Sequence, residues 1–149
     1  MPNDKVRIEI VNKSSFKNPS YASAFSAGCD LQANISEPVI VKPGEIVLIP
    51  TGLFISLPEG YEAQIRSRSG LTLKHGIVVA NGVGTIDADY RGEIKVIITN
   101  ISNIDYQISV GERIAQMVIG EFKQADFTKV EMLDDTERSD GGFGHSGKV

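Results

Sequence analysis

The chain has 149 residues, of which 41% are hydrophobic, and a formal net charge of −4 at pH 7. This length is sufficient for one globular domain that buries roughly two-thirds of the surface its unfolded chain would expose. The acidic balance, without a basic block or a tryptophan, argues against a nucleic-acid binder, and no apolar run approaches the roughly 20 residues that cross a bilayer.

The first residues, MPNDKVRIEIV, lack the apolar block of a signal peptide, so we expect a soluble, unprocessed protein. The single cysteine, Cys29, excludes an internal disulfide and fits a reducing cytoplasm. Two well-separated histidines, His75 and His145, do not provide the usual spacing of zinc ligands.

Short segments of alternating apolar residues predict half-buried strands along the chain. They are centred on Val6–Ile10, Ile46–Leu48, Tyr61–Ile65, Ile94–Ile98 and Ile114–Val118. Turn signals separate them at Pro43-Gly44, Pro58-Glu59-Gly60, Asn81-Gly82 and Gly111. One short helix is predicted in SGLTLKHG, with Ser69 as its N-cap and Gly76 as its end. We therefore expect an all-β, single-domain protein, a distorted barrel or jelly-roll-like sheet pair over residues 1–134, followed by a Gly-rich tail over residues 135–149.

The stretch AGCDL, residues 27–31, places one acid between small and apolar residues. Asp30 is either a turn or cap residue, or a ligand for a hard cation. Mg²⁺ is commonly held by one or two carboxylates, with water and phosphate oxygens completing its shell.

The stretch RSRSGL, residues 66–71, follows a predicted strand and begins the predicted helix. The free N–H groups and the positive dipole end of a helix start favour an anion, and two arginines add charge. An ordinary capped turn with solvated arginines is the alternative.

In VVANGVGTIDADYRGE, residues 78–93, Asn81-Gly82 between two apolar runs predicts a hairpin, whose end leaves main-chain groups free to pair with a base edge. Asp87 and Asp89 would repel each other on one strand face, which indicates either a turn or a general base near a metal. Tyr90 has polar neighbours, which favours a ring that faces a ligand.

In GERIAQM, residues 111–117, Gln116 is expected on one strand face with Ile114 and Val118. An amide on an apolar face needs a partner, either a structural hydrogen bond or a ligand oxygen.

The tail RSDGGFGHSGKV, residues 138–149, is too rich in glycine to be ordered without cost. It is either a loose terminus or a lid over a ligand. The Phe143 ring is stabilised only when it leaves water or stacks on another group. The Arg138 guanidinium can make a bidentate hydrogen bond to a phosphate.

Taken together and in this order, the five stretches closely resemble the five ordered motifs of the homotrimeric dUTP pyrophosphatases (dUTPases), from about Ala27 to Gly147. The resemblance implies hydrolysis of dUTP to dUMP and pyrophosphate, which keeps uracil out of DNA and supplies dUMP for thymidylate synthesis. It implies Mg²⁺ as cofactor, held by Asp30 through water, and Asp87 as the base that activates the water that attacks the α-phosphorus. It also implies a homotrimer with active sites at subunit boundaries.

The substrate-binding residues that the resemblance implies are Arg68, Ser69, Gly70, Asn81, Gly84, Thr85, Ile86, Tyr90, Gln116, Arg138, Phe143, Gly144, His145 and Ser146. Ser69, Gly70 and Gln116 would bind the phosphate chain, which Arg68 and Arg138 would neutralise. Asn81 and the main chain of residues 82–84 would read uracil, and Tyr90 would leave no room for a 2′-hydroxyl. In the family the tail closes over the nucleotide, so Phe143 would stack on uracil while residues 144–146 grip the γ-phosphate.

Cys29 departs from the family pattern, because an aromatic or larger apolar residue is frequent at that position. The nearest rival is dCTP deaminase, which has the same fold. Its relatives read Pro-Gly where this chain has Ala88-Asp89, and carry a catalytic Glu where this chain has Ile97, which cannot shuttle protons. The other rival is a nucleotide-binding scaffold that signals through a partner.

Overall fold

The computed structural model describes residues 5–147 of the chain. In chain order these residues form β1 (Glu9–Asn12), β2 (Gly28–Gln32), β3 (Val39–Val41), β4 (Ile46–Ser56), β5 (Tyr61–Arg66), α1 (Ser69–His75), β6 (Ile77–Val79), β7 (Gly84–Ile86), β8 (Ile94–Asn100), β9 (Tyr106–Ile108) and β10 (Arg113–Glu121). The predicted all-β class with one short helix is confirmed.

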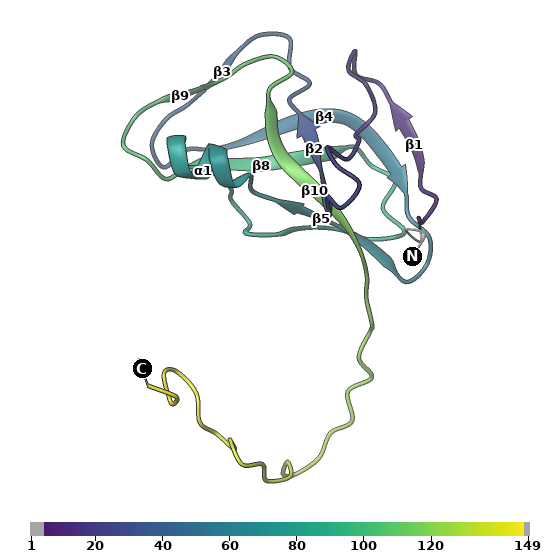
Figure 1. Ribbon diagram of the computed structural model, residues 1–149, viewed down its shortest axis with the longest axis vertical. Helices are drawn as coiled ribbons and strands as arrows, with labels where there is room; N and C mark the ends of the chain where they lie inside the picture. The colour runs from purple at the N-terminus through teal and green to yellow at the C-terminus, as the bar shows by residue number, and fades with distance from the viewer. Residues whose placement is uncertain (1–4, 148–149) are drawn as a thin grey trace.

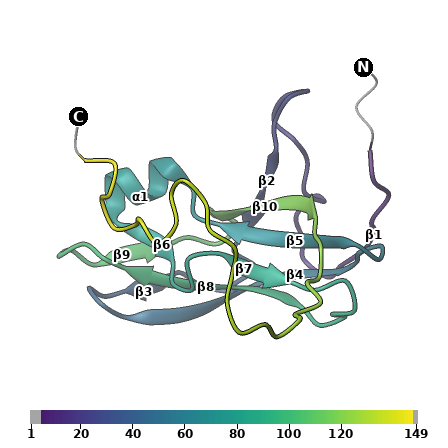
Figure 2. The same ribbon diagram turned by 90° about the horizontal axis from the view of Figure 1, so that it is seen from below.

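The strands form two principal sheets that pack face to face. One has the order β1-β4-β8-β6, the other has the order β2-β10-β5-β7, and β3 and β9 make a small additional pair. Figure 2 shows the two layers, with β2, β10 and β5 in one and β4 and β8 in the other. The arrangement is a distorted jelly roll, and the strands within residues 5–147 do not join into one continuous closed barrel.

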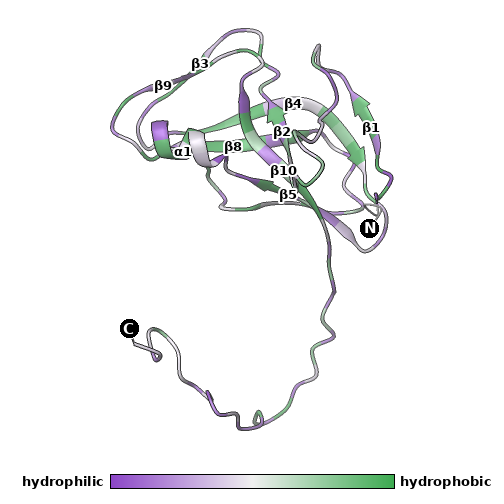
Figure 3. Ribbon diagram, in the orientation of Figure 1, coloured by the Kyte–Doolittle hydropathy of each residue, from purple (hydrophilic) through white to green (hydrophobic). Residues whose placement is uncertain are grey.

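The core lies between the two layers and follows the period of two that the sequence predicts. In β8, Ile94, Val96 and Ile98 are buried and Lys95 between them is exposed. Figure 3 shows apolar residues concentrated along the strands of the two sheets. The first strand lies further along the chain than predicted. Alternation suggested a strand over Val6–Ile10, whereas β1 spans Glu9–Asn12.

Helix α1 corrects one expectation at its start and confirms another at its end. Arg68, not Ser69, occupies the N-cap position in an extended conformation, and no side chain caps the helix there. Ser69 is already the first helical residue. Gly76 ends the helix in the left-handed conformation, with φ 66° and its N–H bonded to the carbonyl of Thr72 at 2.8 Å, as the sequence predicts.

After β10 the chain leaves the body. Figure 1 shows residues 122–147 as an extended segment that runs away from the two sheets. Across residues 5–147, no helix has the length and apolar character that crossing a membrane requires.

Candidate active site

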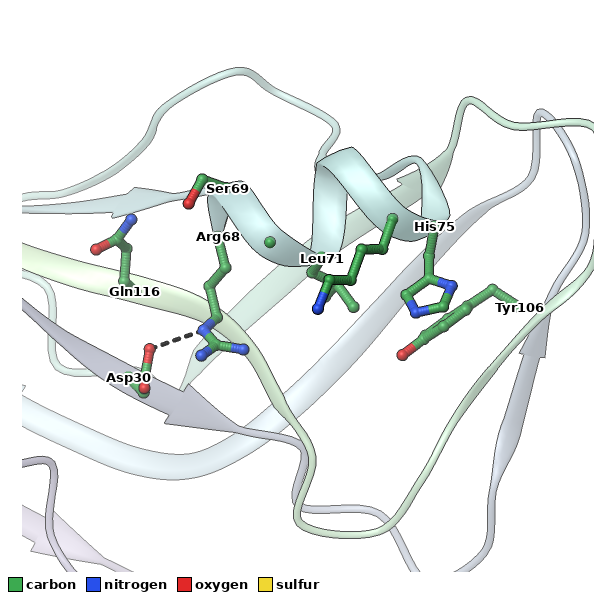
Figure 4. A pocket seen from close by; sticks show the side chains of 9 residues that line it. Asp30, Arg68, Ser69, Leu71, His75, Tyr106 and Gln116 are labelled. Carbon is green, nitrogen blue, oxygen red and sulfur yellow. Dashed lines mark hydrogen bonds and ion pairs between the residues drawn. The ribbon is translucent and has the colours of Figure 1, made fainter.

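The first pocket lies between the start of α1 and strands β2 and β10. It is lined by Asp30, Arg68, Ser69, Gly70, Leu71, Lys74, His75, Tyr106 and Gln116. Figure 4 shows Asp30 and Gln116 facing the start of the helix from neighbouring strands. The structure thus brings Asp30, the residues 68–70 and Gln116 together from three stretches far apart in the chain, without the tail residues that the sequence also suggested for the phosphate chain.

Asp30 is held by two arginines in this pocket. Arg68 Nε donates to Asp30 Oδ1 at 2.9 Å, and an Arg113 guanidinium nitrogen lies 3.7 Å from Asp30 Oδ2. A third contact, from Arg68 to the carbonyl of Arg113 at 3.2 Å, ties the guanidinium to β10. The Arg68 side chain therefore points across the pocket to Asp30. It cannot cap the helix, because a guanidinium has no acceptor for the free N–H groups of the first turn.

The side chains near Asp30 can bind only a metal ion that takes few of its ligands from the protein. Within residues 5–147, no three side chains of His, Cys, Asp or Glu converge as a metal cage would require. Both carboxylate oxygens of Asp30 face guanidinium groups, which leaves them poorly placed for direct coordination. An ion with mostly water and phosphate ligands, as Mg²⁺ prefers, fits this arrangement with Asp30 reached through water.

Gln116 belongs to β10, where it pairs with Asp30 on one side and Arg66 on the other. Its Nε2 donates to the carbonyl of Ser67 at 3.0 Å. The expectation that it shares a face with Ile114 is complicated by an irregularity in the strand. The register shifts between Arg113 and Ala115, so Ile114 is fully buried while Gln116 is half-buried at the pocket.

Cys29, next to Asp30, is a buried thiol whose Sγ lies 3.6 Å from the carbonyl of Met117. Burial raises the pKa of the Cys29 thiol above its ordinary value. The side chain is therefore a small neutral core residue, as the sequence suggested for a cysteine at this position.

The second pocket lies at the end of β7 and beside β8. It is lined by Leu48, Ile65, Val79, Asn81, Gly84, Thr85, Ile86, Asp87, Tyr90, Glu93, Lys95, Val96 and Ile97. The polar groups Asn81, Asp87 and Tyr90 stand against an apolar wall, which is the usual character of a small-molecule site. Asn81, Gly84 and Tyr90, which the sequence suggested for the base and sugar, line this pocket, whereas Gly82, Val83 and Phe143 are not among its lining residues.

The turn at Asn81-Gly82 exists, but it does not make the predicted hairpin. The N–H of Gly82 bonds to the carbonyl of Val79 at 3.0 Å, and Gly82 has a φ of 77°. The strand before it, β6, pairs with β8, whereas the strand after it, β7, pairs with β5 in the other sheet. The turn therefore carries the chain from one layer to the other and opens the pocket between them.

Asp87 and Tyr90 are held in a tight turn after β7. The N–H of Tyr90 bonds to the carbonyl of Asp87 at 3.1 Å, so Asp87 and Asp89 lie in a turn and not on one strand face. The Tyr90 hydroxyl donates to the carbonyl of Glu93 at 2.9 Å. The ring also packs on Gly92, where an added Cβ would lie 2.4 Å from the Tyr90 oxygen. Asp87 itself is exposed to the pocket.

The tail residues are not brought to either pocket within this chain. Arg138 Nε donates to the carbonyl of Gly141 at 2.7 Å, and the ring of Phe143 is fully exposed. Residues 144–146 lie in further turns of the same segment.

Several lining residues were missed by sequence reasoning. Lys74, His75 and Tyr106 extend the first pocket, where the rings of His75 and Tyr106 lie 4.8 Å apart. Burial and a hydrogen bond to Glu112 raise the pKa of Tyr106. Arg113 stands in a stretch that the sequence singled out, but its role depends on the pairing of β2 with β10, which no local pattern reports.

The comparisons with known proteins are consistent along the chain. A model of the dUTPase family matches residues 14–147. The deoxyuridine 5′-triphosphate nucleotidohydrolase of Finegoldia magna is 53% identical over 142 residues, which are 95% of this chain and 99% of that protein. The protein of the same name from Cytophaga hutchinsonii is 55% identical over 141 residues, 95% of this chain and 92% of that protein.

Solved structures agree with the fold. A mutant dUTPase of Staphylococcus bacteriophage 80alpha, solved with dUpNHpp, has a TM-score of 0.86 and 28% identity, and the match covers 97% of this chain and all of that one. A mutant dUTPase from phage phi11 of S. aureus, described as revealing the coordination of a structural Mg(II) ion, has a TM-score of 0.77 and 25% identity over 87% of this chain and all of that one. The family match includes both pockets and the tail.

Proposed function

This chain belongs to the dUTPase family, and from that membership we propose how its residues carry out the reaction. The chain is a dUTP diphosphatase that hydrolyses dUTP to dUMP and pyrophosphate. The observation that carries the proposal is the presence of two pockets of complementary chemistry. One gathers cations and donors around Asp30, and the other sets Asn81, Asp87 and Tyr90 against an apolar wall.

The first pocket binds the phosphate chain. Arg68 supplies a fixed positive charge, because its ion pair with Asp30 holds the guanidinium in place. Ser69 and Gly70 are exposed at the start of α1, where main-chain N–H groups and the helix dipole favour an anion. Gln116 adds a side-chain donor from β10. These groups stabilise the negative charge on the triphosphate while water attacks the α-phosphorus.

Asp30 is proposed to hold Mg²⁺ through water, with phosphate oxygens of the substrate completing the shell. Its two arginine partners support an indirect role of this kind. When bound, the ion supplies positive charge that stabilises the triphosphate and the departing pyrophosphate.

Asp87 is proposed as the general base. Its carboxylate accepts a proton from a water molecule while the water oxygen forms a bond to the α-phosphorus. The bond from the α-phosphorus to the oxygen that bridges to the β-phosphate then breaks, and pyrophosphate leaves with that electron pair. The exposure of Asp87 to the second pocket supports this role, because the base must reach a water beside the nucleotide.

The second pocket binds and recognises the base and the sugar of the nucleotide. Asn81 and the main chain of residues 82–86 form the turn and strand at its edge, where amide groups can pair with uracil. Tyr90, fixed by its bond to the carbonyl of Glu93 and by packing on Gly92, is proposed to fill the space that a 2′-hydroxyl would need. Ile97 lines this pocket with a side chain that cannot transfer protons, which disfavours deamination.

We propose that three copies assemble and that each site is completed at a subunit boundary. Large apolar side chains exposed on the single chain support an assembly, since a soluble monomer rarely leaves many uncovered. They include Ile46 at 67%, Leu48 at 57% and Phe127 at 92% exposure.

In the same proposal, residues 1–134 form the catalytic core and residues 135–149 are an arm that closes over the nucleotide. Phe143 stacks on uracil, while Arg138 and Gly144, His145 and Ser146 hold the γ-phosphate. Residues 1–4 and 148–149 lie outside the described residues. The full exposure of the Phe143 ring supports a role that depends on a ligand to cover it.

The cytoplasm is the proposed location, supported by a single cysteine that is buried as a thiol.

A product-resolved assay tests the function. The purified protein is offered dUTP, dCTP, UTP and dTTP separately with Mg²⁺, and each product is identified. We expect dUMP and pyrophosphate from dUTP alone. Deamination of dCTP would contradict the assignment of Ile97, and equal turnover of UTP would contradict the role of Tyr90.

A further inference from the structure

Ser67 is hydrogen-bonded to one lining residue of each pocket, Gln116 and Val79, and is itself among the lining residues of neither. It stands in the short link between β5 and α1, and it is half-buried. Its side-chain Oγ accepts a hydrogen bond from the N–H of Val79 at 2.9 Å. Its main-chain carbonyl accepts the bond from Gln116 Nε2 at 3.0 Å. One residue therefore joins the phosphate-binding link to β6 and to β10.

We propose that Ser67 is a positioning residue that fixes which end of the Gln116 amide is presented to the phosphate chain. The proposal rests on the proposed function, in which Gln116 binds phosphate. It adds a residue that acts through Gln116 and does not touch the substrate.

The two ends of a glutamine amide differ in their hydrogen-bonding capacity. Nε2 carries two N–H donors, whereas Oε1 only accepts. The Ser67 carbonyl also only accepts, so it holds Nε2 beside it and leaves the second N–H of the same nitrogen for an anion. A flipped amide would set Oε1 against the Ser67 carbonyl and against the phosphate. Both contacts would be repulsive, so the carbonyl selects the binding orientation.

The Ser67 side chain fixes the position of that carbonyl. Strand β6 is at the edge of its sheet, with β8 as its strand neighbour. Val79 is buried, at 3% exposure, and a buried N–H left without a partner is costly. The Ser67 hydroxyl satisfies this N–H and so anchors the link between β5 and α1 to β6. Loss of the hydroxyl should release the link and, with it, the acceptor for Gln116.

The test compares Ser67→Ala and Ser67→Val, which lose the hydroxyl, with Ser67→Thr, which keeps it. Thr72→Ala is the matched control. Thr72 Oγ1 also makes a hydroxyl-to-main-chain bond to β6, at 2.9 Å to the carbonyl of Ile77, but it does not hold the acceptor of Gln116.

The first readout is the side-chain amide signal of Gln116 in a ¹⁵N-resolved NMR spectrum without nucleotide, assigned with Gln116→Glu. We expect Ser67→Ala and Ser67→Val to move this signal toward that of a free glutamine and to speed its hydrogen exchange. Ser67→Thr and Thr72→Ala should leave it in place. An unchanged signal in Ser67→Ala, or the same loss in Ser67→Thr, would overturn the proposal.

The second readout is the affinity for dUpNHpp with Mg²⁺. We expect Ser67→Ala to weaken it about tenfold, the lower end of what a charge-assisted hydrogen bond contributes, while Ser67→Thr restores it. Failure of the wild type to bind dUpNHpp would refute the proposed function, whereas the nucleotide-free spectrum tests Ser67 separately. If Ser67→Ala and Ser67→Val do not fold, the wild-type spectrum decides, because a Gln116 amide that exchanges as fast as free glutamine overturns the proposal.

Discussion

Replacing Gly28 with alanine should separate catalytic activity from stability. Gly28 opens β2 and lies opposite Val118 of β10. A Cβ at this position would lie 2.5 Å from Gln116 Oε1 and 3.4 Å from Gln116 Cδ. A Cβ and an oxygen that are not bonded to each other do not come as close as 2.5 Å, so something must move. The end of the Gln116 side chain is flexible and yields before the backbone does.

The size of the effect follows from the contacts that Gln116 gives up. A displaced Gln116 amide loses its 3.0 Å hydrogen bond to the Ser67 carbonyl. It also loses the proposed hydrogen bond to the phosphate chain. A hydrogen bond to a charged group contributes about 1.5–3 kcal/mol, so kcat/KM for dUTP should fall roughly ten- to a hundredfold. The lost neutral bond costs about 1 kcal/mol of stability. Alanine raises the free energy of unfolding by about 0.5–1 kcal/mol, because a glycine in a strand loses more backbone freedom on folding than an alanine does. The free energy of unfolding should therefore change little.

The assay pairs pyrophosphate release over a range of dUTP concentrations with denaturant unfolding of the same protein. Gly120→Ala is the matched control, since Gly120 lies in β10 and an added Cβ there meets no atom within 4 Å. Full wild-type kcat/KM in Gly28→Ala, or a loss of activity in Gly120→Ala as large as that in Gly28→Ala, would refute this prediction.

Three further predictions address the base, the tail and the thiol. Asp87→Asn should lower kcat by about 10²–10⁴-fold, the usual contribution of a general base, yet still bind dUpNHpp in a calorimetric titration; near-normal turnover would remove Asp87 from that role. A chain that ends at Glu137 should keep the melting temperature of the full protein and lose at least about tenfold in kcat/KM, because the charge-assisted contacts of Arg138 and the stacking of Phe143 are gone. Undiminished activity would show that the tail is not a lid. Cys29 should resist iodoacetamide at pH 8 in the folded protein and react once guanidinium unfolds it, because burial raises the pKa of the thiol and keeps it protonated. Rapid alkylation of the folded protein, followed by mass spectrometry, would contradict this.

Local patterns in the sequence were sufficient for the class of fold and for the four longest strands, β4, β5, β8 and β10. Alternation alone locates β8, because one face of that strand is buried and the other is not. The glycine at the end of α1 was predictable for a similar reason, since a left-handed residue favours glycine whatever surrounds it.

Features that depend on partners distant in the chain were not predictable in this way. Asn81-Gly82 reads as a hairpin turn, but the strands on its two sides bond to β8 and β5. Ser69 has the side chain of an N-cap, but Arg68 occupies that position, and the Arg68 side chain binds Asp30, which lies 38 residues away in sequence. Asp30, Asp87 and Gln116 stood out within their own stretches with alternatives open, and only the resemblance implied one role for each. The separation of the candidate site residues into two pockets came from the fold.

In its proposed role as an arm, the extended segment after β10 is a tether with a limited reach. Between Glu121 and Phe143 the chain has no helix or strand, so as a flexible coil of about 22 residues it spans roughly 25 Å on average. A group on such a tether is present around its anchor at an effective concentration in the millimolar range, whatever the dilution of the enzyme. In that role, Phe143 and Arg138 would search a small volume continuously. The probability that they meet a bound nucleotide is set by the length of the tether and not by the amount of protein in the cell.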